Sequence, residues 1–362
     1  MNILEEFKKA VSEDNNEVDF NSIEEKARVD ITVDIAEPES ALKIGNQLWG
    51  TLGNFSVIMG KAKSKKTFLV TASAAAAIGS TTTLNNIKGA LKAEKSIVYY
   101  FDTEQSKYHV LKLARRAVSL AGHDWNTTKL VVYALRSFNT NERFQFINNK
   151  LTNEADGVGL VVIDGVRDLL RDINSPDEAT VISDALLRWT ENKNLHIVTI
   201  LHANKTDGNL RGHIGTELLN KAEAIIKVEA DDKNKNISVV SCERSRNKDF
   251  EEFAFEINMA GLPVNCDMPD KNNGGNEKIK PKEIGVDAHK QMMIDNIEKS
   301  AKPCRKGILV DSICDSLEEL GWGSLGKRKG EQFLRYWETN GWVVNNGTDK
   351  KSDYAVKKYP VD

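Results

Sequence analysis

The sequence predicts an α/β fold in which helices flank a mostly parallel sheet. Apolar runs at residues 96–101, 159–163 and 196–201 are continuous rather than alternating, as expected of strands buried on both faces. Helical stretches separate the strands, at residues 107–121, 142–153 and 177–192. This alternation of strands and helices predicts right-handed crossovers and a parallel sheet.

Length and composition indicate more than one soluble globular domain. The chain has 362 residues, a formal net charge of −3 and 40% hydrophobic residues. No apolar run approaches the roughly 20 residues that cross a bilayer, and the first residues lack the pattern of a signal peptide. The cysteines form no C-x-x-C pair, so neither a zinc site nor a disulfide framework is expected. A reducing cytoplasm is the expected compartment.

Four parts are expected along the chain. Residues 1–37 form a helical segment, and residues 38–268 form the domain that carries the sheet. Residues 224–229 and 237–242 are predicted to form a β-hairpin that extends the edge of this sheet. Residues 269–283, rich in Asn and Gly, are a linker, and residues 284–362 form a small separate domain.

A loop after the apolar strand at residues 55–59 has the features of a phosphate-binding loop. It comprises Gly60, Lys61, Ala62, Lys63, Ser64, Lys65, Lys66 and Thr67, and an Ala-rich helix follows from Phe68. Strand, tight loop and helix place backbone N–H groups around an anion. In the G-x-x-x-x-G-K-[ST] pattern, Lys66 bridges phosphate oxygens and Thr67 binds Mg²⁺, which predicts ATP and Mg²⁺ as ligands of residues 60–68.

Lys65 departs from this pattern, because the second glycine is expected at its position. A lysine there requires a permissive backbone angle and room for a long side chain. The alternative interpretation of the whole loop is a basic surface turn.

Carboxylates follow two further strands. Asp164 ends the strand at residues 159–163, where it could hold Mg²⁺ through water; alternatively, it starts a turn with Gly165. Glu104 lies just beyond the strand at residues 96–101, where it could deprotonate a water aimed at the γ-phosphate. Glu104 could instead occupy only the first turn of a helix. Asp102 is the other candidate base.

His202 ends the last of these strands and is a candidate sensor of the γ-phosphate, although a lone histidine is often structural. The loop that follows contains three glycines, and loops of this kind are usually functional or disordered. Lys205 and Arg211 in this region suit contact with nucleic acid.

Arg244 and Arg246 follow the second strand of the predicted hairpin and point the same way if the strand continues. Such a pair could stabilise phosphoryl transfer in the site of a neighbouring subunit. The alternative is a solvated, charged strand end.

The last domain shows three helical patterns and two β-prone pieces, which is the outline of a winged helix. Its third helix would present Lys327, Arg328 and Lys329, and its wing Lys350, to the phosphates of DNA. Small domains of this kind also serve as protein-docking or lid modules, and the fold alone does not decide between these functions.

Together these residues resemble the RecA-like ATPase core, and within it the hexameric replicative-helicase branch of the DnaB and RepA types. The resemblance covers about residues 40–265. It implies that Lys66 and Thr67 are the phosphate-loop pair, that Asp164 is the Mg²⁺-associated aspartate and that Glu104 is the catalytic glutamate. It also implies that His202 is the sensor, where many relatives have glutamine.

The same resemblance matches Arg244 and Arg246 to the basic pair that reaches into the next subunit's site. The stretch at residues 201–217 is similar to ATPases of bacterial plasmids and mobilizable elements. The expected function is therefore that of an ATP-hydrolysing, DNA-associated protein, a ring-forming helicase or motor for plasmid or mobile-element DNA. It would bind single-stranded DNA through its ATPase loops and duplex DNA through the winged helix.

Two alternatives belong to other classes of function. The first is a nucleotide-gated DNA-binding regulator with weak or no ATPase activity, in which ATP controls assembly. The second is a phosphotransferase acting on a small substrate, which would leave the basic loop and the paired arginines without a role.

Overall fold

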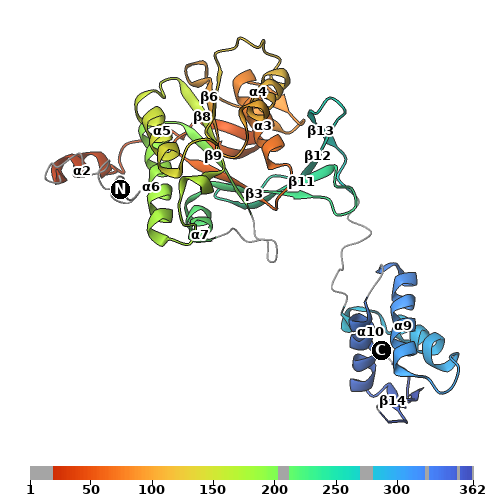
Figure 1. Cartoon of the computed structure of the whole chain (residues 1–362). Helices are drawn as coiled ribbons and strands as arrows, with labels where there is room; N and C mark the ends of the chain where they lie inside the picture. The colour runs from red at the N-terminus through yellow and green to blue at the C-terminus, as the bar shows by residue number, and fades with distance from the viewer. Residues whose placement is uncertain (1–18, 203–211, 270–279, 323–325, 349–350, 361–362) are drawn as a thin grey trace. The chain divides into compact units, whose positions relative to one another are not determined.

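The computed structural model describes residues 19–202, 212–269, 280–322, 326–348 and 351–360. The chain divides into two compact units, Met1–Pro269 and Asp270–Asp362 (Figure 1). No helix in these described ranges is long and apolar enough to cross a membrane.

The first unit is built on a nine-stranded sheet with the order β13-β12-β11-β10-β3-β9-β8-β6-β7. The strands are β3 (Phe55–Gly60), β6 (Ile97–Asp102), β7 (Leu130–Ala134), β8 (Val158–Asp164), β9 (His196–His202), β10 (Ala224–Ala230), β11 (Ile237–Ser245), β12 (Phe253–Ile257) and β13 (Pro263–Cys266). Strands β10, β3, β9, β8, β6 and β7 pair in parallel, whereas β11, β12 and β13 continue the sheet antiparallel. The predicted α/β fold with a mostly parallel sheet is confirmed.

Helices cover both faces of this sheet (Figure 1). On one face lie α3 (Lys66–Gly79) and α4 (Lys107–Leu120), and on the other α5 (Thr140–Asn153), α6 (Pro176–Lys193) and α7 (Gly212–Lys221). Successive strand residues point to opposite faces, so β3 places Ile58 in the first core and Val57 and Met59 in the second. Burial of both faces explains why the central strands are continuously apolar.

A second, four-stranded sheet with the order β2-β1-β5-β4 packs against α3 and was not predicted. Its strands are β1 (Ser40–Ile44), β2 (Gln47–Thr51), β4 (Thr82–Thr83) and β5 (Ile87–Gly89). Gly89 allows the close approach, because a Cβ there would lie 1.9 Å from the carbonyl oxygen of Ala76. The remaining elements of this unit are α2 (Phe20–Ala27) and the 3-10 turns η1 (Ala93–Lys95) and η2 (Val166–Leu169).

The second unit has its own core around Phe333, Trp337 and Leu309. Its described elements are η3 (Pro281–Glu283), α8 (Val286–Met293), the π-helical turn η4 (Ile294–Glu298), α9 (Lys306–Leu317), the π-helical turn η5 (Glu318–Trp322), α10 (Lys327–Thr339), β14 (Val343–Asn345) and β15 (Tyr354–Val356). β14 and β15 pair antiparallel. Three helices followed by a hairpin is the expected order, and the winged-helix assignment itself stays a prediction.

The register of the large sheet brings the predicted strand ends together. Gly60 of β3 lies beside His202 of β9, and Asp102 of β6 lies beside Asp164 of β8. Since these strands are neighbours in the order β3-β9-β8-β6, their carboxyl ends form one edge of the sheet. Ligands of open α/β sheets bind at such an edge.

Candidate nucleotide-binding site

The loop between β3 and α3 wraps closely over strand β10. A Cβ on Gly60 would lie 2.2 Å from the carbonyl oxygen of Val228, so only glycine permits this approach. Lys63 and Lys65 both have φ +66°, in the left-handed region that non-glycine residues seldom adopt. Lys65 therefore takes the backbone conformation that the missing glycine would take. Its long side chain is accommodated beside β11, where its Nζ contacts Lys235 and Ser238.

Lys66 is the first residue of α3, and its side chain folds back into the loop. Its Nζ donates to the carbonyl oxygens of Gly60 (2.8 Å) and Lys61 (2.9 Å) and lies 3.2 Å from His202 Nδ1. The three donors of the ammonium group are thus all engaged. Burial lowers the pKa of Lys66 to about 8, although the charges of Asp164 and Glu104 oppose this shift.

Ser64 provides the test of whether a phosphate group fits the loop. Its Oγ is the single buried side-chain polar atom in the described residues that has no hydrogen-bond partner. Leaving such an atom unpaired costs about 1–3 kcal/mol. A phosphate oxygen in the loop would accept from this hydroxyl, so the residues present fit the group.

Thr67, at the end of the loop, meets Asp164. Thr67 Oγ1 donates to Asp164 Oδ2 (3.2 Å), and the buried hydroxyl of Tyr100 donates to the same oxygen (2.9 Å). Burial, assisted by the charge of Asp102, raises the pKa of Asp164 to about 7. A cation bound beside this carboxyl group would favour its ionised form and lower its pKa again.

Mg²⁺ would bind here through few protein ligands. The described part of the chain contains no group of three His, Cys, Asp or Glu side chains able to hold a metal alone. Mg²⁺ usually takes one or two protein oxygens and completes its octahedron with phosphate and water. Thr67 and Asp164 are the residues that would hold the ion.

Glu104 and His202 form a pair beside Lys66. His202 Nε2 lies 3.4 Å from Glu104 Oε1, and both side chains are partly exposed. Because the Lys66 ammonium group only donates, His202 Nδ1 must accept, which assigns the imidazole proton to Nε2. The resulting hydrogen bond from His202 is the main cause that lowers the pKa of Glu104.

Asp102, the other candidate base, is used differently. Its carboxylate is fully buried and accepts from the backbone N–H groups of Glu104 (3.0 Å) and Gln105 (2.7 Å) and from Gln105 Nε2 (2.6 Å). It therefore holds the turn that presents Glu104. Both carboxylate oxygens of Asp102 accept hydrogen bonds within this turn, so Glu104 is better placed than Asp102 to accept a proton from water.

Sequence reasoning missed Tyr100 and Thr103. Tyr100 looked like a core residue of an apolar strand, yet its hydroxyl contacts Asp164. Thr103 Oγ1 donates to the carbonyl oxygen of Asp164 (3.0 Å) and thereby fixes the backbone at the end of β8. A polar hydroxyl inside an otherwise apolar strand was the available signal for Tyr100.

Arg244 and Arg246 lie apart from this site. Arg244 lies near the end of β11 and Arg246 follows it; because β11 runs antiparallel to β10, both lie at the sheet edge opposite the loop. Arg244 donates to the carbonyl oxygen of Leu219 (3.1 Å) and Arg246 to that of Lys221 (2.9 Å), at the C-terminal end of α7. Within one chain these arginines cap a helix and do not reach the phosphate loop.

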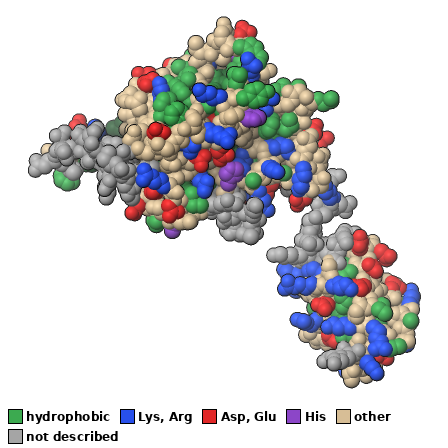
Figure 2. All heavy atoms as spheres, in the orientation of Figure 1, with side chains coloured by type: hydrophobic (Ala, Val, Ile, Leu, Met, Phe, Trp, Pro, Cys, Tyr) green, Lys and Arg blue, Asp and Glu red, His purple; other side chains and the backbone are tan. Residues whose placement is uncertain are grey.

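The predicted nucleic-acid residues are described only in part. Lys205, Arg211 and Lys350 lie outside the described residues. Lys327 forms an ion pair with Asp311 (2.8 Å), and Lys329 Nζ lies 3.0 Å from Gln332 Oε1. Arg328 is exposed. Lys and Arg side chains are spread over the face of the second unit that Figure 2 shows.

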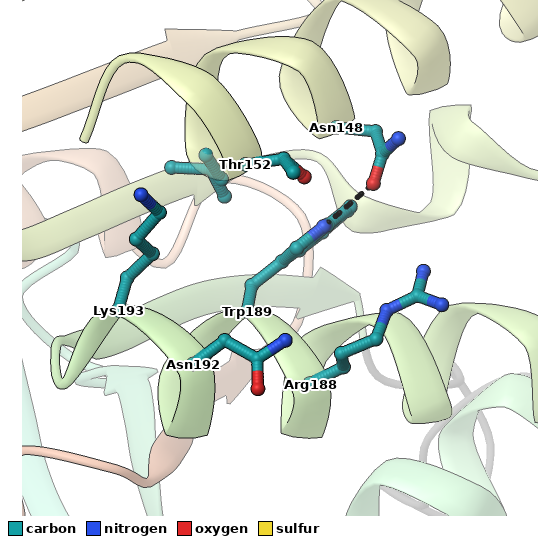
Figure 3. A pocket seen from close by; sticks show the side chains of 7 residues that line it. Asn148, Thr152, Arg188, Trp189, Asn192 and Lys193 are labelled. Atoms are coloured by element: carbon teal, nitrogen blue, oxygen red, sulfur yellow. Dashed lines mark hydrogen bonds between the residues drawn. The ribbon is translucent and has the colours of Figure 1, made fainter. Parts of the chain in front are cut away.

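A hollow of about 310 Å³ lies elsewhere, between α5 and α6 (Figure 3). Trp189 Nε1 donates to Asn148 Oδ1 (2.9 Å) in its wall, and Arg188, Asn192 and Lys193 also line it. Lys193 ends α6 shortly before β9 begins, so this hollow lies toward the sheet edge opposite the loop. It contains none of the predicted site residues.

Comparisons with known proteins found a matching family model and a similar solved structure. A family model described as an AAA domain, AAA_25, matches residues 24–208, which is just over half of the chain. The crystal structure of the RadB recombinase is similar, with a TM-score of 0.41 and 17% identity, over 60% of this chain and 92% of that chain. No curated protein matches the sequence. The chain belongs to the AAA_25 family of AAA domains, and its first unit is a P-loop NTPase domain.

Proposed function

We propose that this protein hydrolyses ATP between the subunits of a homo-oligomeric ring and acts on DNA as a helicase or motor of a plasmid or mobile element. The observation that supports ATP hydrolysis best is the continuous chain of contacts through Lys66, His202 and Glu104, next to the Thr67–Asp164 pair. At one edge of the sheet, these side chains would supply a cationic group for phosphate, a site for Mg²⁺ and a general base.

Lys66 would bind the β- and γ-phosphates, exchanging its bonds to the carbonyl oxygens of Gly60 and Lys61 for bonds to phosphate. Mg²⁺, held by Thr67 and through water by Asp164, would neutralise charge on the phosphates. Glu104 would orient a water molecule and accept its proton. With a lowered pKa, the Glu104 carboxylate is ionised at neutral pH, as a base must be.

His202 would report the state of the phosphate. Its Nδ1 contacts Lys66 and its Nε2 contacts Glu104, so a movement of Lys66 toward phosphate removes one of its two partners. His202 directly precedes residues 203–211, which contain Lys205 and Arg211. We propose that this stretch grips single-stranded DNA and that His202 connects it to the nucleotide.

The position of Arg244 and Arg246 supports a homo-oligomer. Arg244 and Arg246 lie at the edge opposite their own loop. They could therefore complete only the site of another subunit, where two guanidinium groups would stabilise charge on the transferring phosphoryl group. In the second unit, the α10 residues Lys327, Arg328 and Lys329 would contact duplex phosphates if the unit acts as a winged helix.

The decisive test is ATP hydrolysis in the presence of single-stranded DNA by the full chain and by Lys66→Ala. We expect the variant to lose about 10²-fold or more in rate, the loss typical of a group that stabilises transition-state charge. Lys112→Ala, an exposed lysine of α4 outside the loop, is the control and should retain activity. Equal rates for the full chain and Lys66→Ala would contradict the proposal.

One observation favours a nucleotide-gated DNA-binding regulator instead. All donors of Lys66 are already engaged by the loop and by His202, so phosphate binding must displace existing bonds, which suits slow turnover. Affinity for a specific duplex, measured with and without residues 284–362, separates the two functions. A regulator should lose its specific binding on truncation, whereas a motor should keep ATPase activity on single strands.

A further inference from the structure

Two lysines of the phosphate loop share a backbone conformation but differ in what their side chains contact. Lys63 and Lys65 both have φ +66°. The Lys63 side chain is exposed, whereas that of Lys65 reaches the turn between β10 and β11. Lys65 Nζ donates to the carbonyl oxygen of Lys235 at 2.5 Å and lies 3.4 Å from Ser238 Oγ.

Ser238 completes this connection from the other side. It is fully buried near the start of β11, and its Oγ donates to the carbonyl oxygen of Ser64 at 3.2 Å. The contacts of Lys65 with Lys235 and Ser238, and of Ser238 with Ser64, are called the Lys65 bridge below. Ser64 also carries the unpaired hydroxyl, so the bridge fixes the backbone where a phosphate would bind.

Strand β11 joins the Lys65 bridge to the arginine pair. Ser238 stands near its first residue and Arg244 near its last, roughly 20 Å apart at 3.3 Å per residue. The first part of β11 is paired on both sides, with β10 and with β12. This double pairing holds the first part of β11 in place, whereas its pairing with β10 shifts register between Cys242 and Arg244.

We propose that Lys65 is a positioning residue that couples the nucleotide state of its own loop to the beginning of β11. This inference rests on the proposed function of the loop. A glycine at this position would let the loop move independently of the turn. Lysine instead ties the loop to Lys235 and Ser238, so a loop that closes on phosphate must move β11 or break the bridge.

The first test uses the full chain without nucleotide. Hydrogen exchange at the amides of residues 235–238 is compared in Lys65→Met, which keeps side-chain length but removes the donor, and in Lys63→Met as the matched control. We expect about tenfold faster exchange in Lys65→Met alone, the effect of losing a charge-assisted hydrogen bond. Lys65→Arg, which keeps a cationic donor, should exchange like the wild type.

The second test adds a non-hydrolysable ATP analogue. In the wild type, binding should change the exchange of residues 235–238. In Lys65→Met the analogue should still bind through Lys66, but this change should be smaller, because only the contact between Ser238 and Ser64 still joins the loop to β11. If Lys65 only stabilised the fold, its substitution would change hydrogen exchange by the same factor with and without the analogue.

The coupling would be overturned, and the proposed ATPase left intact, if Lys65→Met behaved like Lys63→Met without nucleotide and like the wild type with the analogue. If Lys65→Met does not fold, Lys65→Gly removes the whole side chain and suits the φ of +66°, and wild-type exchange in that variant would overturn the proposal equally. Failure of the wild type to bind the analogue would instead contradict the proposed function. The nucleotide-free comparison would then still decide whether the bridge holds the turn.

Discussion

The carboxyl group of Asp164 is placed for function at the expense of stability. It is almost completely buried, and its register partner on β6, Asp102, is also acidic. Hydrogen bonds from Tyr100 and Thr67 do not offset this burial, so the pKa of Asp164 rises from 3.8 to about 7. A site that awaits a cation is expected to be destabilising while the cation is absent.

The variant Asp164→Asn should therefore stabilise the nucleotide-free protein. Between about pH 4 and pH 7 the folded state keeps a proton on Asp164 that the unfolded state has lost, so the free energy of unfolding falls as pH rises through this window. Above pH 7 the buried carboxylate lowers the free energy of unfolding by about 4 kcal/mol, at about 1.36 kcal/mol for each unit of pKa. Asparagine removes it while its amide oxygen can still accept from Tyr100 and Thr67.

The measurement is thermal unfolding without nucleotide from pH 4 to pH 8. The Tm of Asp164→Asn should exceed that of the wild type at pH 8, with a difference that shrinks toward pH 4, and Mg²⁺-dependent hydrolysis should be lost. Asp156→Asn is the control, since the Asp156 side chain is 95% exposed. A lower Tm for Asp164→Asn at pH 8 would refute this account of the site.

Glu104→Gln separates binding from chemistry. Glutamine keeps an oxygen that can accept from His202 Nε2 but cannot take a proton from water. We expect the hydrolysis rate to fall by about 10²–10⁴-fold, the usual contribution of a general base, while affinity for an ATP analogue changes little. Glu94→Gln, exposed on η1, should behave like the wild type in both assays. Wild-type turnover in Glu104→Gln would assign the base to another group.

At the level of elements, the sequence predicted well wherever burial on two faces makes a strand continuously apolar. The strands that end in Asp164 and His202 were predicted to within a few residues for this reason. The four-stranded sheet against α3 was missed, because strands of two to five residues with mixed polarity carry little periodic signal. The Lys65 bridge could not be predicted either, since it joins residues about 170 positions apart.

The packing of the phosphate loop against β10 depends on Gly60. A Cβ there would lie 2.2 Å from the carbonyl oxygen of Val228 and 2.8 Å from Ser64 Oγ. Gly60→Ala should push the loop away from β10, lower the free energy of unfolding by about 1–3 kcal/mol and weaken binding of an ATP analogue. Gly122→Ala is the control, because its φ of +67° is strained but its surroundings are open. Chemical denaturation and analogue titration of both variants provide the measurement, and equal losses in both would show that the contact with Val228 is unimportant.

At the scale of the whole molecule, the first unit exposes a series of apolar side chains near its beginning. On α2, Phe20 and Ile23 are exposed, and the segment that follows, which turns at residues 31–33, exposes Val29, Ile31, Val33 and Ile35. Ile31 is 95% exposed. Exposed apolar residues that lie together often mark an interaction site. This segment is therefore a candidate interaction surface.

Mixing inactive subunits tests whether the arginines act between chains. Lys66→Ala subunits have intact arginines, and Arg244→Ala/Arg246→Ala subunits have an intact phosphate loop. Each should be inactive alone, by about 10³-fold or more for the arginine variant. In a mixture, an arginine from the first kind can complete the loop of the second, so ATP hydrolysis should reappear.

The matched control mixes Lys66→Ala with Glu104→Gln subunits. Both changes damage the same half of the site, so every interface stays defective and no activity should return. Because Arg244 and Arg246 also donate to the carbonyl oxygens of Leu219 and Lys221, the Tm of their variant must be measured to show that α7 stays folded. Recovery only in the first mixture requires a site shared by two subunits. If a stably folded arginine variant remains fully active alone, these residues serve only as the cap of α7, and the protein completes its catalytic site without a neighbour.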